Sequence, residues 1–270
     1  MDSYGYRVLA RDAAAKLVSA LGIDPEHPPS IGCVLGTGWG KTLDFGPDSK
    51  TTPFADIPGF SGLQTLEGHA RQVVYGKVAD KPVIALRGRV HANEDVDTAL
   101  RIQIEMLVHL GVKTLILTCA AGSLDLAIDV GSVVLIDELI TLFAPQRPLC
   151  TGEFCTPNST IDTLKIEALE SAFRSSSIRV HRGKHVMVLG PDFEGPTDKK
   201  ILASFGASVV GMSILPEVRV AALYAGVKVI PIAFVTNDAV EKHSHTENQR
   251  RAEAASPYLG ALLEQVITSL

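Results

Sequence analysis

Hydrogen-bond donors and positive charges gather where short apolar runs of the sequence end. Arg89 and His91 follow the run 82–86, and Thr37 lies among the glycines that follow the run 31–35. Guanidinium, imidazole and hydroxyl groups, together with backbone N–H groups that glycine leaves accessible, are the donors that a phosphate or a carboxylate needs. The sequence therefore predicts an anion site assembled from distant segments. Its candidate members are Thr37, His69, Arg89, His91, Ser213 and the backbone around Ala120.

A second set of side chains suits a flat heteroaromatic ring. Phe193 and Met212 offer apolar faces, while Glu194 and Asn237 offer hydrogen bonds to a ring edge. An anion site beside a site for an aromatic base indicates an enzyme that uses a nucleoside and phosphate. Taken singly, Glu194 could be a helix-start charge before Pro196, and Asn237 could be a cap or a turn residue.

The glycines of residues 36–40 fit neither common nucleotide-binding loop. Lys41 stands where a dinucleotide-binding GxGxxG loop needs its third glycine, and the stretch is not a Walker A loop. A tight turn would explain these glycines equally well. The charges of residues 87–95 would likewise suit a solvated loop or the first turn of a helix.

Alternating strand and helix patterns must position these residues. Residues 208–235 are typical of a βαβ unit, in which Pro216 and Glu217 open the helix and Gly226 ends it. Ligands of open α/β sheets bind outside the carboxyl ends of the strands, so residues 212–213 and 236–238 are expected to wall one pocket. Strands are predicted at 31–35, 73–75, 82–86, 114–118, 133–136, 185–189, 208–210 and 227–235, and helices at 12–21, 96–110, 161–173, 197–205 and 256–270.

These elements predict an α/β fold over residues 1–270, a single domain with a twisted mixed, mostly parallel β-sheet flanked by helices.

The chain is 46% apolar and 20% charged, with a net charge of −5 and no run of Lys or Arg, so neither a nucleic-acid nor a membrane surface is indicated. No signal-peptide or membrane-span pattern appears, so a cytoplasmic protein is expected. Without a CxxC pair, a zinc site is disfavoured and the cysteines are interpreted as free thiols or small buried hydrophobes: Cys33, Cys119, Cys150 and Cys155.

Short motifs in a fixed order resemble the trimeric (low-molecular-mass type) purine nucleoside phosphorylases. The resemblance covers residues 31–239, and its most distinctive part is the Gly-Met-Ser run before Pro216-Glu217. It implies a nucleoside phosphorylase-like fold, a homotrimer, and a reaction in which phosphate attacks the anomeric carbon of a purine nucleoside and releases free base and pentose 1-phosphate. The motifs are Gly36-Thr37-Gly38-Trp39-Gly40, Gly68-His69-Ala70, Gly88-Arg89-Val90-His91, Ala120-Ala121-Gly122-Ser123, Gly190-Pro191-Asp192-Phe193-Glu194, Gly211-Met212-Ser213-Ile214-Leu215-Pro216-Glu217 and Thr236-Asn237.

The resemblance also implies residue roles. Glu194 resembles the carboxylate that binds the N1 side of the purine, and Asn237 the amide that holds N7 and O6; with His91 they are the expected catalytic residues. Bond cleavage leaves positive charge on the sugar and negative charge on the purine, which phosphate and an amide donor would stabilise, so no metal or organic cofactor is required. Thr37, His69, Arg89, His91, Ala120 and Ser213 resemble the phosphate site, and Ala121, Gly122, Phe193, Glu194, Met212, Asn237 and His245 the base and sugar site.

Departures from the family pattern concentrate on the sugar pocket. Asn93 stands where a tyrosine is common, Cys119 where asparagine is frequent, and Asp238 where many relatives carry Lys or an apolar residue. The loop 142–159 is short; in the family it carries a phenylalanine to the neighbouring subunit's sugar site, and Phe154 is the nearest candidate.

Glu194 with Asn237 favours 6-oxopurine nucleosides, inosine and guanosine with their deoxy forms, because an aspartate in place of Asn237 would favour a 6-amino base. The alternatives are a methylthioadenosine phosphorylase, a non-catalytic nucleoside-binding module and a hydrolytic nucleosidase. His243 and His245 are interpreted as solvated rather than as metal ligands.

Overall fold

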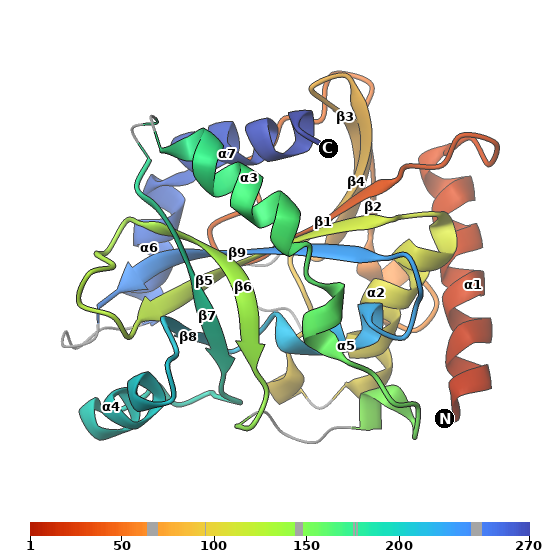
Figure 1. Ribbon diagram of the computed structural model, residues 1–270. Coiled ribbons are helices and arrows are strands. Elements are labelled where there is room, and N and C mark those ends of the chain that lie inside the picture. Colours follow the sequence, from red (N-terminus) through yellow and green to blue (C-terminus); the bar gives the residue numbers. More distant parts are fainter. Residues whose placement is uncertain (64–69, 95, 144–147, 175, 177, 239–244) are drawn as a thin grey trace.

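A sheet of nine strands runs through the part of the chain that the structure describes, and helices pack around it (Figure 1). The computed structural model describes residues 1–63, 70–94, 96–143, 148–174, 176, 178–238 and 245–270. The strands are β1 (Ile31–Leu35), β2 (Lys50–Pro53), β3 (Gln72–Val78), β4 (Lys81–Arg87), β5 (Thr114–Ser123), β6 (Val133–Ile140), β7 (Val180–Met187), β8 (Val209–Gly211) and β9 (Lys228–Asn237).

The helices cover the sheet in groups. Helix α1 packs on α2 and α2 on α5, while α3 packs on β6 and β7, and α6 on β5 and β9. Short 3-10 helices lie in the connections at Phe54–Asp56, Ala92–Glu94, Pro148–Cys150 and Pro157–Thr160. The α-helices are α1 (Ser3–Leu21), α2 (Asp97–Leu110), α3 (Thr163–Phe173), α4 (Pro196–Ser204), α5 (Leu215–Ala221), α6 (His245–Ala254) and α7 (Ser256–Thr268). In the described residues, no helix combines the length and the apolar character that crossing a membrane requires.

The predicted fold class is confirmed, with a sheet that mixes both strand directions. Parallel pairs join β1 to β4 and β5, β5 to β9, and β7 to β6 and β8. Antiparallel pairs join β3 to β2 and β4, β5 to β8, and β6 to β9. Strand β1 is buried at every position, as expected for a parallel strand covered on both faces.

The strands predicted at 73–75 and 82–86 are confirmed, and they form a hairpin. Strands β3 and β4 pair antiparallel from Gln72↔Arg87 to Val78↔Lys81. The turn between them is Ala79-Asp80, with φ of 49° and 62°, and turns of this left-handed kind match the twist of the flanking strands.

Strand β5 is longer than predicted, and its outer edge changes partner. Cys119 to Ser123, expected to follow the strand, belong to it. One edge of β5 pairs with β9 from Thr114 to Gly122. The other edge pairs with β1 only over Thr114–Leu117 and with β8 only at Gly122 and Ser123. Strands β1 and β8 therefore separate along β5 and leave a gap at residues 118–121.

The predicted βαβ unit at residues 208–235 is wrong in two respects, the first being that its helix ends at Ala221 and not at Gly226. Strand β8 runs antiparallel to β5 while β9 runs parallel to it, so β8 and β9 point in opposite directions. Helix α5 nevertheless begins next to Pro216, as predicted. The two strand ends also still meet, because Val210 and Asn237 both pair with Gly122.

Pro231 fits the sheet because of where its missing N–H falls. It lies opposite Leu117 in the β5–β9 ladder, while the ladder between β9 and β6 starts at Ile232. The proline therefore precedes the stretch where an N–H toward β6 is needed, which explains how an inner strand tolerates it.

Candidate active site

A cavity of about 670 Å³ opens where β1 and β8 separate along β5. It brings together most of the residues that the sequence analysis singled out. His69 lies outside the described residues; His245 begins α6, and its side chain is likewise not described. The predicted site residues that line the cavity are Thr37, Arg89, His91, Ala120, Ala121, Gly122, Phe193, Glu194, Met212, Ser213 and Asn237.

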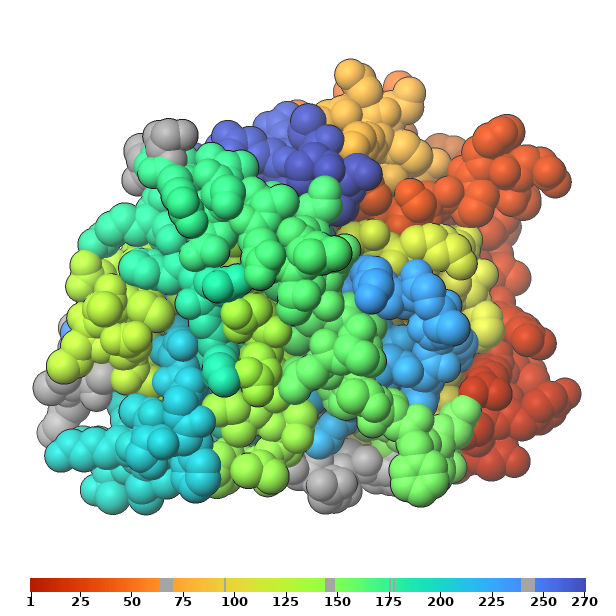
Figure 2. Space-filling model, in the orientation of Figure 1, coloured from red at the N-terminus to blue at the C-terminus, as the bar shows by residue number. Residues whose placement is uncertain are grey.

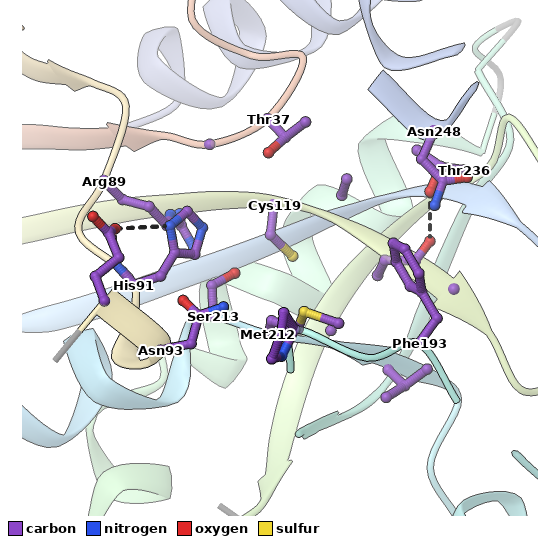
Figure 3. A pocket seen from close by; sticks show the side chains of 18 of the residues that line it. Thr37, Arg89, His91, Asn93, Cys119, Phe193, Met212, Ser213, Thr236 and Asn248 are labelled. Atoms are coloured by element: carbon purple, nitrogen blue, oxygen red, sulfur yellow. Dashed lines mark hydrogen bonds and ion pairs between the residues drawn. The ribbon is translucent and has the colours of Figure 1, made fainter. Parts of the chain in front are cut away.

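The cavity has two chemically different ends (Figure 3). Arg89, His91, Asn93 and Ser213 lie toward one end, which is rich in donors and charge. Phe193, Thr236 and Asn248 lie toward the other, and Met212 and Cys119 lie between. This arrangement suits an anion at one end and a flat ring at the other.

The side chain of Arg89 is only 1% exposed, and two groups of the protein contact its guanidinium. Its Nη2 donates to the carbonyl oxygen of Thr118, in the stretch of β5 that neither β1 nor β8 covers, and its Nη1 lies 3.3 Å from Glu217 Oε1. Gly36 must be a glycine here, because a Cβ would lie 2.6 Å from the Thr118 carbonyl oxygen and 3.4 Å from the guanidinium. The glycine stretch after β1 therefore makes room for the arginine.

His91 is oriented by a carboxylate. Glu94 Oε1 accepts from the His91 backbone N–H at 2.8 Å and lies 3.3 Å from His91 Nδ1, while Arg71 forms an ion pair with Glu94. Burial alone would raise the pKa of Glu94, but the hydrogen bonds from His91 and the Arg71 charge outweigh it and lower the pKa to about 2. The ionised Glu94 can only accept, so a proton on His91 is favoured at Nδ1.

Ser213 sits at a strained point of the chain. Ile214, which follows it, has a φ of 79°, a value that β-branched residues rarely adopt. The Ile214 side chain is completely buried, and packing of this kind can hold such a conformation at a functional site.

Asn237 presents an amide at the ring end of the cavity. Its side chain is 2% exposed, and its Oδ1 lies 3.2 Å from the Thr236 hydroxyl, which also reaches the Ala121 carbonyl oxygen at 3.3 Å. Within the described part of the chain, its Nδ2 has no hydrogen-bond partner. A Cβ on Gly122 would lie 2.6 Å from this Nδ2, so the glycine leaves the N–H donors access to the cavity.

Glu194 is the carboxyl group at the same end. Burial raises its pKa, although its own backbone amide and Lys199 act in the opposite direction. The neighbouring Phe193 is 41% exposed, so its ring borders the cavity rather than the core.

Asp238 was expected in the pocket wall, but it lies outside the residues that line the cavity. Its carbonyl oxygen accepts from Lys199 Nζ at 2.8 Å.

The side chain of Cys119 lies in the cavity wall, and burial raises the pKa of its thiol to about 12, so the thiol is neutral.

Asn248 was missed by the sequence analysis. It lies on α6, is 7% exposed and lines the ring end of the cavity. Helix α6 is docked by Arg251, whose Nη1 donates to the Thr236 carbonyl oxygen at 2.8 Å. The helix is too polar to show an apolar stripe, but Asn248 stands three residues after His245, and such residues share one face of a helix.

Comparison with known proteins agrees with this geometry. Residues 30–268 match the phosphorylase superfamily. The chain is 33% identical over 265 residues to the purine nucleoside phosphorylase of Mycobacterium tuberculosis, covering 96% of this chain and 95% of that protein. It is 28% identical over 268 residues to the mouse (Mus musculus) purine nucleoside phosphorylase, covering 91% and 90%.

A solved structure gives the same result for the fold. The purine nucleoside phosphorylase of Schistosoma mansoni, in complex with inosine, superimposes with a TM-score of 0.86 at 25% identity, covering 97% of this chain and 96% of that one. With the superfamily match over most of its length and relatives above 30% identity, this chain belongs to the purine nucleoside phosphorylases of the phosphorylase superfamily.

Proposed function

We propose that this protein catalyses the phosphorolysis of purine nucleosides to free purine base and pentose 1-phosphate, with 6-oxopurine nucleosides as its preferred substrates. The observation that carries the proposal is that one cavity has Arg89 at its cationic end and an amide donor, Asn237 Nδ2, at its other end. The similar proteins from Mycobacterium tuberculosis and mouse are named for this activity, and the Schistosoma mansoni enzyme was crystallised with inosine.

In the proposed reaction, phosphate occupies the end of the cavity formed by Thr37, Arg89, His91, Ala120 and Ser213, with His69 completing the set by resemblance. A phosphate oxygen forms a bond to the anomeric carbon while the bond from that carbon to the purine nitrogen breaks. The electron pair of the broken bond moves onto the purine. Phosphate beneath the sugar stabilises its developing positive charge, and a donor at the purine stabilises the negative charge.

Base preference rests on the pair Glu194 and Asn237. The amide of Asn237 can donate to N7 and tolerates an oxygen at the 6 position. A 6-oxopurine carries a hydrogen on N1, which the Glu194 carboxylate can accept. A 6-amino purine has no hydrogen on N1, so Glu194 discriminates against it. Ala121, Gly122, Phe193, Met212 and His245 complete the proposed base and sugar site.

We also propose that the protein assembles as a homotrimer, as the resemblance to its family implies. Phosphate is a co-substrate, and the reaction as written uses no cofactor.

The direct test incubates the protein with inosine, guanosine, adenosine and methylthioadenosine, with and without phosphate. Free base and pentose 1-phosphate are both measured. We expect phosphate-dependent release from inosine and guanosine only. Cleavage of the 6-amino substrates would refute the base preference, cleavage without phosphate would indicate a nucleosidase, and no turnover would favour a nucleoside-binding module.

Replacing Asn237 by Asp tests the base assignment itself. A carboxylate accepts from a 6-amino group and repels a 6-oxo group, so the ratio of kcat/KM for adenosine over inosine should rise by about 10²-fold. Asp238→Asn is the matched control, because the neighbouring Asp238 lies outside the cavity lining and its replacement should leave the ratio unchanged. An unchanged ratio in Asn237→Asp would contradict the assignment.

A further inference from the structure

A buried carboxylate faces Arg89 from within the protein. Glu217, in the first turn of α5, is 1% exposed, and its Oε1 lies 3.3 Å from Arg89 Nη1. In the described part of the chain, neither Glu217 oxygen has a hydrogen-bond partner, and the Nε and Nη1 of Arg89 have none either. The contact between the two side chains is therefore an ion pair whose groups are not saturated by other donors and acceptors.

Two buried titratable groups that interact with Arg89, His185 and Cys119, add no charge beside it. His185 is completely buried, and burial together with the Arg89 charge lowers its pKa to about 3, so the imidazole is neutral. The Cys119 thiol is neutral as well, because burial raises its pKa to about 12. These two neutral groups leave the charge of Arg89 balanced by Glu217, the carboxylate in contact with it.

We propose that Glu217 is a positioning residue that competes with phosphate for Arg89 and thereby keeps phosphate binding reversible. The inference rests on the proposed function, since it takes this end of the cavity as the phosphate site. In the empty site Glu217 balances the arginine, which would otherwise be a buried uncompensated charge. When phosphate arrives, the two anions share one guanidinium and repel each other in a site that water screens poorly.

The structure separates this role of Glu217 from simple support of Arg89. The Nη2 of Arg89 donates to the Thr118 carbonyl oxygen, whereas it is the other terminal nitrogen, Nη1, that contacts Glu217. Loss of the Glu217 charge therefore leaves a hydrogen bond that keeps the arginine in the cavity wall. Pentose 1-phosphate carries the same phosphate group, so the competition also favours release of the product.

Glu217→Gln tests the proposal, because it removes the charge and keeps the shape of the side chain. Binding of inorganic phosphate is measured by calorimetry at constant ionic strength, without nucleoside. We expect the Kd for phosphate to fall about tenfold, which corresponds to about 1.4 kcal/mol. The KM for phosphate should fall in parallel and inhibition by pentose 1-phosphate should strengthen, while the KM for the nucleoside stays within twofold.

Glu105→Gln is the matched control. Glu105 and Arg101 form a second ion pair, 2.7 Å apart with both side chains 0% exposed, away from the residues that line the cavity. Removing this carboxylate should lower the unfolding temperature and leave the phosphate Kd unchanged. Glu217→Asp is a second test in a variant that retains its charge, since it draws the carboxylate back by one methylene; it should tighten phosphate binding by less than Glu217→Gln does.

An unchanged or weaker phosphate Kd in folded Glu217→Gln, or in Glu217→Asp if the first variant does not fold, would overturn the role given to Glu217. That result, with phosphate-dependent turnover intact in the unsubstituted protein, leaves the proposed function standing. If the unsubstituted protein binds no phosphate, the proposed function fails and this inference fails with it.

Discussion

The amide of Asn237 depends on the absence of a side chain at position 122. A Cβ there would lie 2.6 Å from Asn237 Nδ2, closer than non-bonded atoms approach, and the buried asparagine has little room to move away. The placement of the proposed donor to the purine is thus a consequence of one glycine within β5 rather than of Asn237 alone.

Gly122→Ala should therefore lower kcat/KM for inosine by about 10²-fold, the usual cost of displacing one donor that stabilises developing charge. Gly40→Ala is the control, since a Cβ at Gly40 meets nothing within 4 Å and should leave activity unchanged. Both variants are assayed with saturating phosphate. Activity of Gly122→Ala within threefold of the unsubstituted protein would show that Asn237 is not positioned in this way.

Glu94 predicts a pH dependence of stability. Its pKa is about 2 in the folded protein, because hydrogen bonds from His91 and the Arg71 charge outweigh the opposing effect of burial, against about 4.3 for an unfolded glutamate. A lowered carboxyl pKa contributes stability that is present above about pH 4.3 and is lost as the pH falls toward 2; here it amounts to about 3 kcal/mol.

Thermal unfolding of Glu94→Gln and of the unsubstituted protein should accordingly differ most at pH 5 to 7, and the difference should shrink as the pH falls from 4 toward 2. Glu264→Gln, which changes an exposed glutamate on α7, should follow the unsubstituted protein throughout. A difference for Glu94→Gln that is constant with pH would argue against a low pKa for Glu94.

The elements that hold the cavity were only partly predictable from the sequence. Strands β1, β3 and β4 were predicted because short apolar runs mark them. Strand β5 was predicted too short, since its second half, Cys119 to Ser123, consists of small residues that are also typical of turns. Periodicity cannot distinguish the two, and the strand is fixed instead by its long-range partners β8 and β9.

The direction of β8 was unpredictable for a similar reason. A strand–helix–strand pattern usually joins parallel neighbours, but β8 has only three residues and pairs with β5 and β7, not with β9. The polar residues at its end still reached the cavity, because the walls of the site depend on Gly122, which pairs with both Val210 and Asn237. The sequence analysis therefore placed the ends of β8 and β9 side by side correctly, although its argument about strand direction was wrong.

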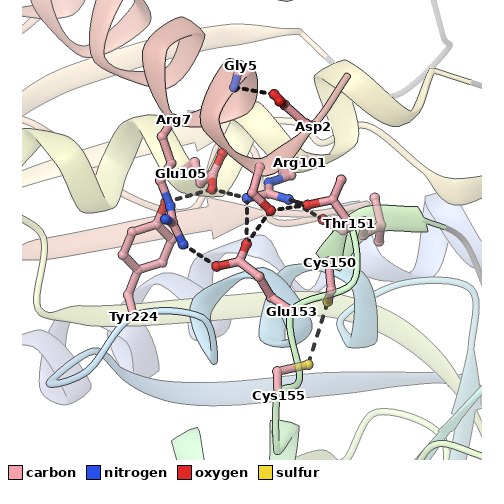
Figure 4. Close-up of polar contacts among 12 residues, drawn as sticks. Asp2, Gly5, Arg7, Arg101, Glu105, Cys150, Thr151, Glu153, Cys155 and Tyr224 are labelled. Atoms are coloured by element: carbon pink, nitrogen blue, oxygen red, sulfur yellow. Dashed lines mark hydrogen bonds and ion pairs between the residues drawn. The ribbon is translucent and has the colours of Figure 1, made fainter.

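Helix α2 is joined to the segment after β6 by a buried charge network (Figure 4). Arg101 is 0% exposed; its Nη1 donates to the Leu149 carbonyl oxygen at 2.7 Å and to Thr151 Oγ1 at 3.0 Å, and its Nη2 to Glu105 at 2.7 Å. The guanidinium carbon also lies 4.5 Å from the Tyr6 ring centre, so α1 takes part. Arg101 thus anchors residues 149–151 to α2.

Arg101→Met should destabilise the protein by about 3–5 kcal/mol, because it leaves Glu105 as an uncompensated buried charge. Amide hydrogens of residues 149–155 should exchange faster in this variant. Adding Glu105→Leu should recover most of the loss, since neither buried charge of the pair is then present. The measurements are denaturant unfolding and hydrogen exchange, and a loss below 1 kcal/mol for Arg101→Met would rule out this anchoring role.

At the scale of the whole molecule, two apolar features lie on different parts of the surface. Residues 148–155 stand out at one edge beside α1, and α4 stands out at the opposite side of the same face (Figure 2). The first segment carries Phe154, which is fully exposed. Beside α4 lies a second cavity of about 350 Å³, which shares Phe193 and Glu194 with the ring end of the candidate active site. Its apolar wall is formed by Phe143, Val188, Phe193, Ile201 and Leu202.

Two different patches on one chain suit a head-to-tail contact between copies, which closes into a ring when the rotation between copies closes and otherwise extends as a filament. A closed ring of three copies is the homotrimer proposed above from the resemblance to the family. Light scattering should give three times the 28.8 kDa mass of one chain. In such a ring the Phe154 side chain of one subunit would lie beside the ring end of its neighbour's cavity.

Phe154→Ala should then raise the KM for the nucleoside about tenfold and leave the Kd for phosphate unchanged, because the second cavity borders the ring end of the candidate active site and not its phosphate end. Unfolding of a single chain should be unaffected, as the side chain is exposed within its own chain. Leu126→Ala, another exposed apolar residue at 82%, is the control and should change neither constant. A monomer with full activity would refute the ring, whereas a trimer in which Phe154→Ala changes nothing would keep the assembly and exclude Phe154 from the neighbouring site.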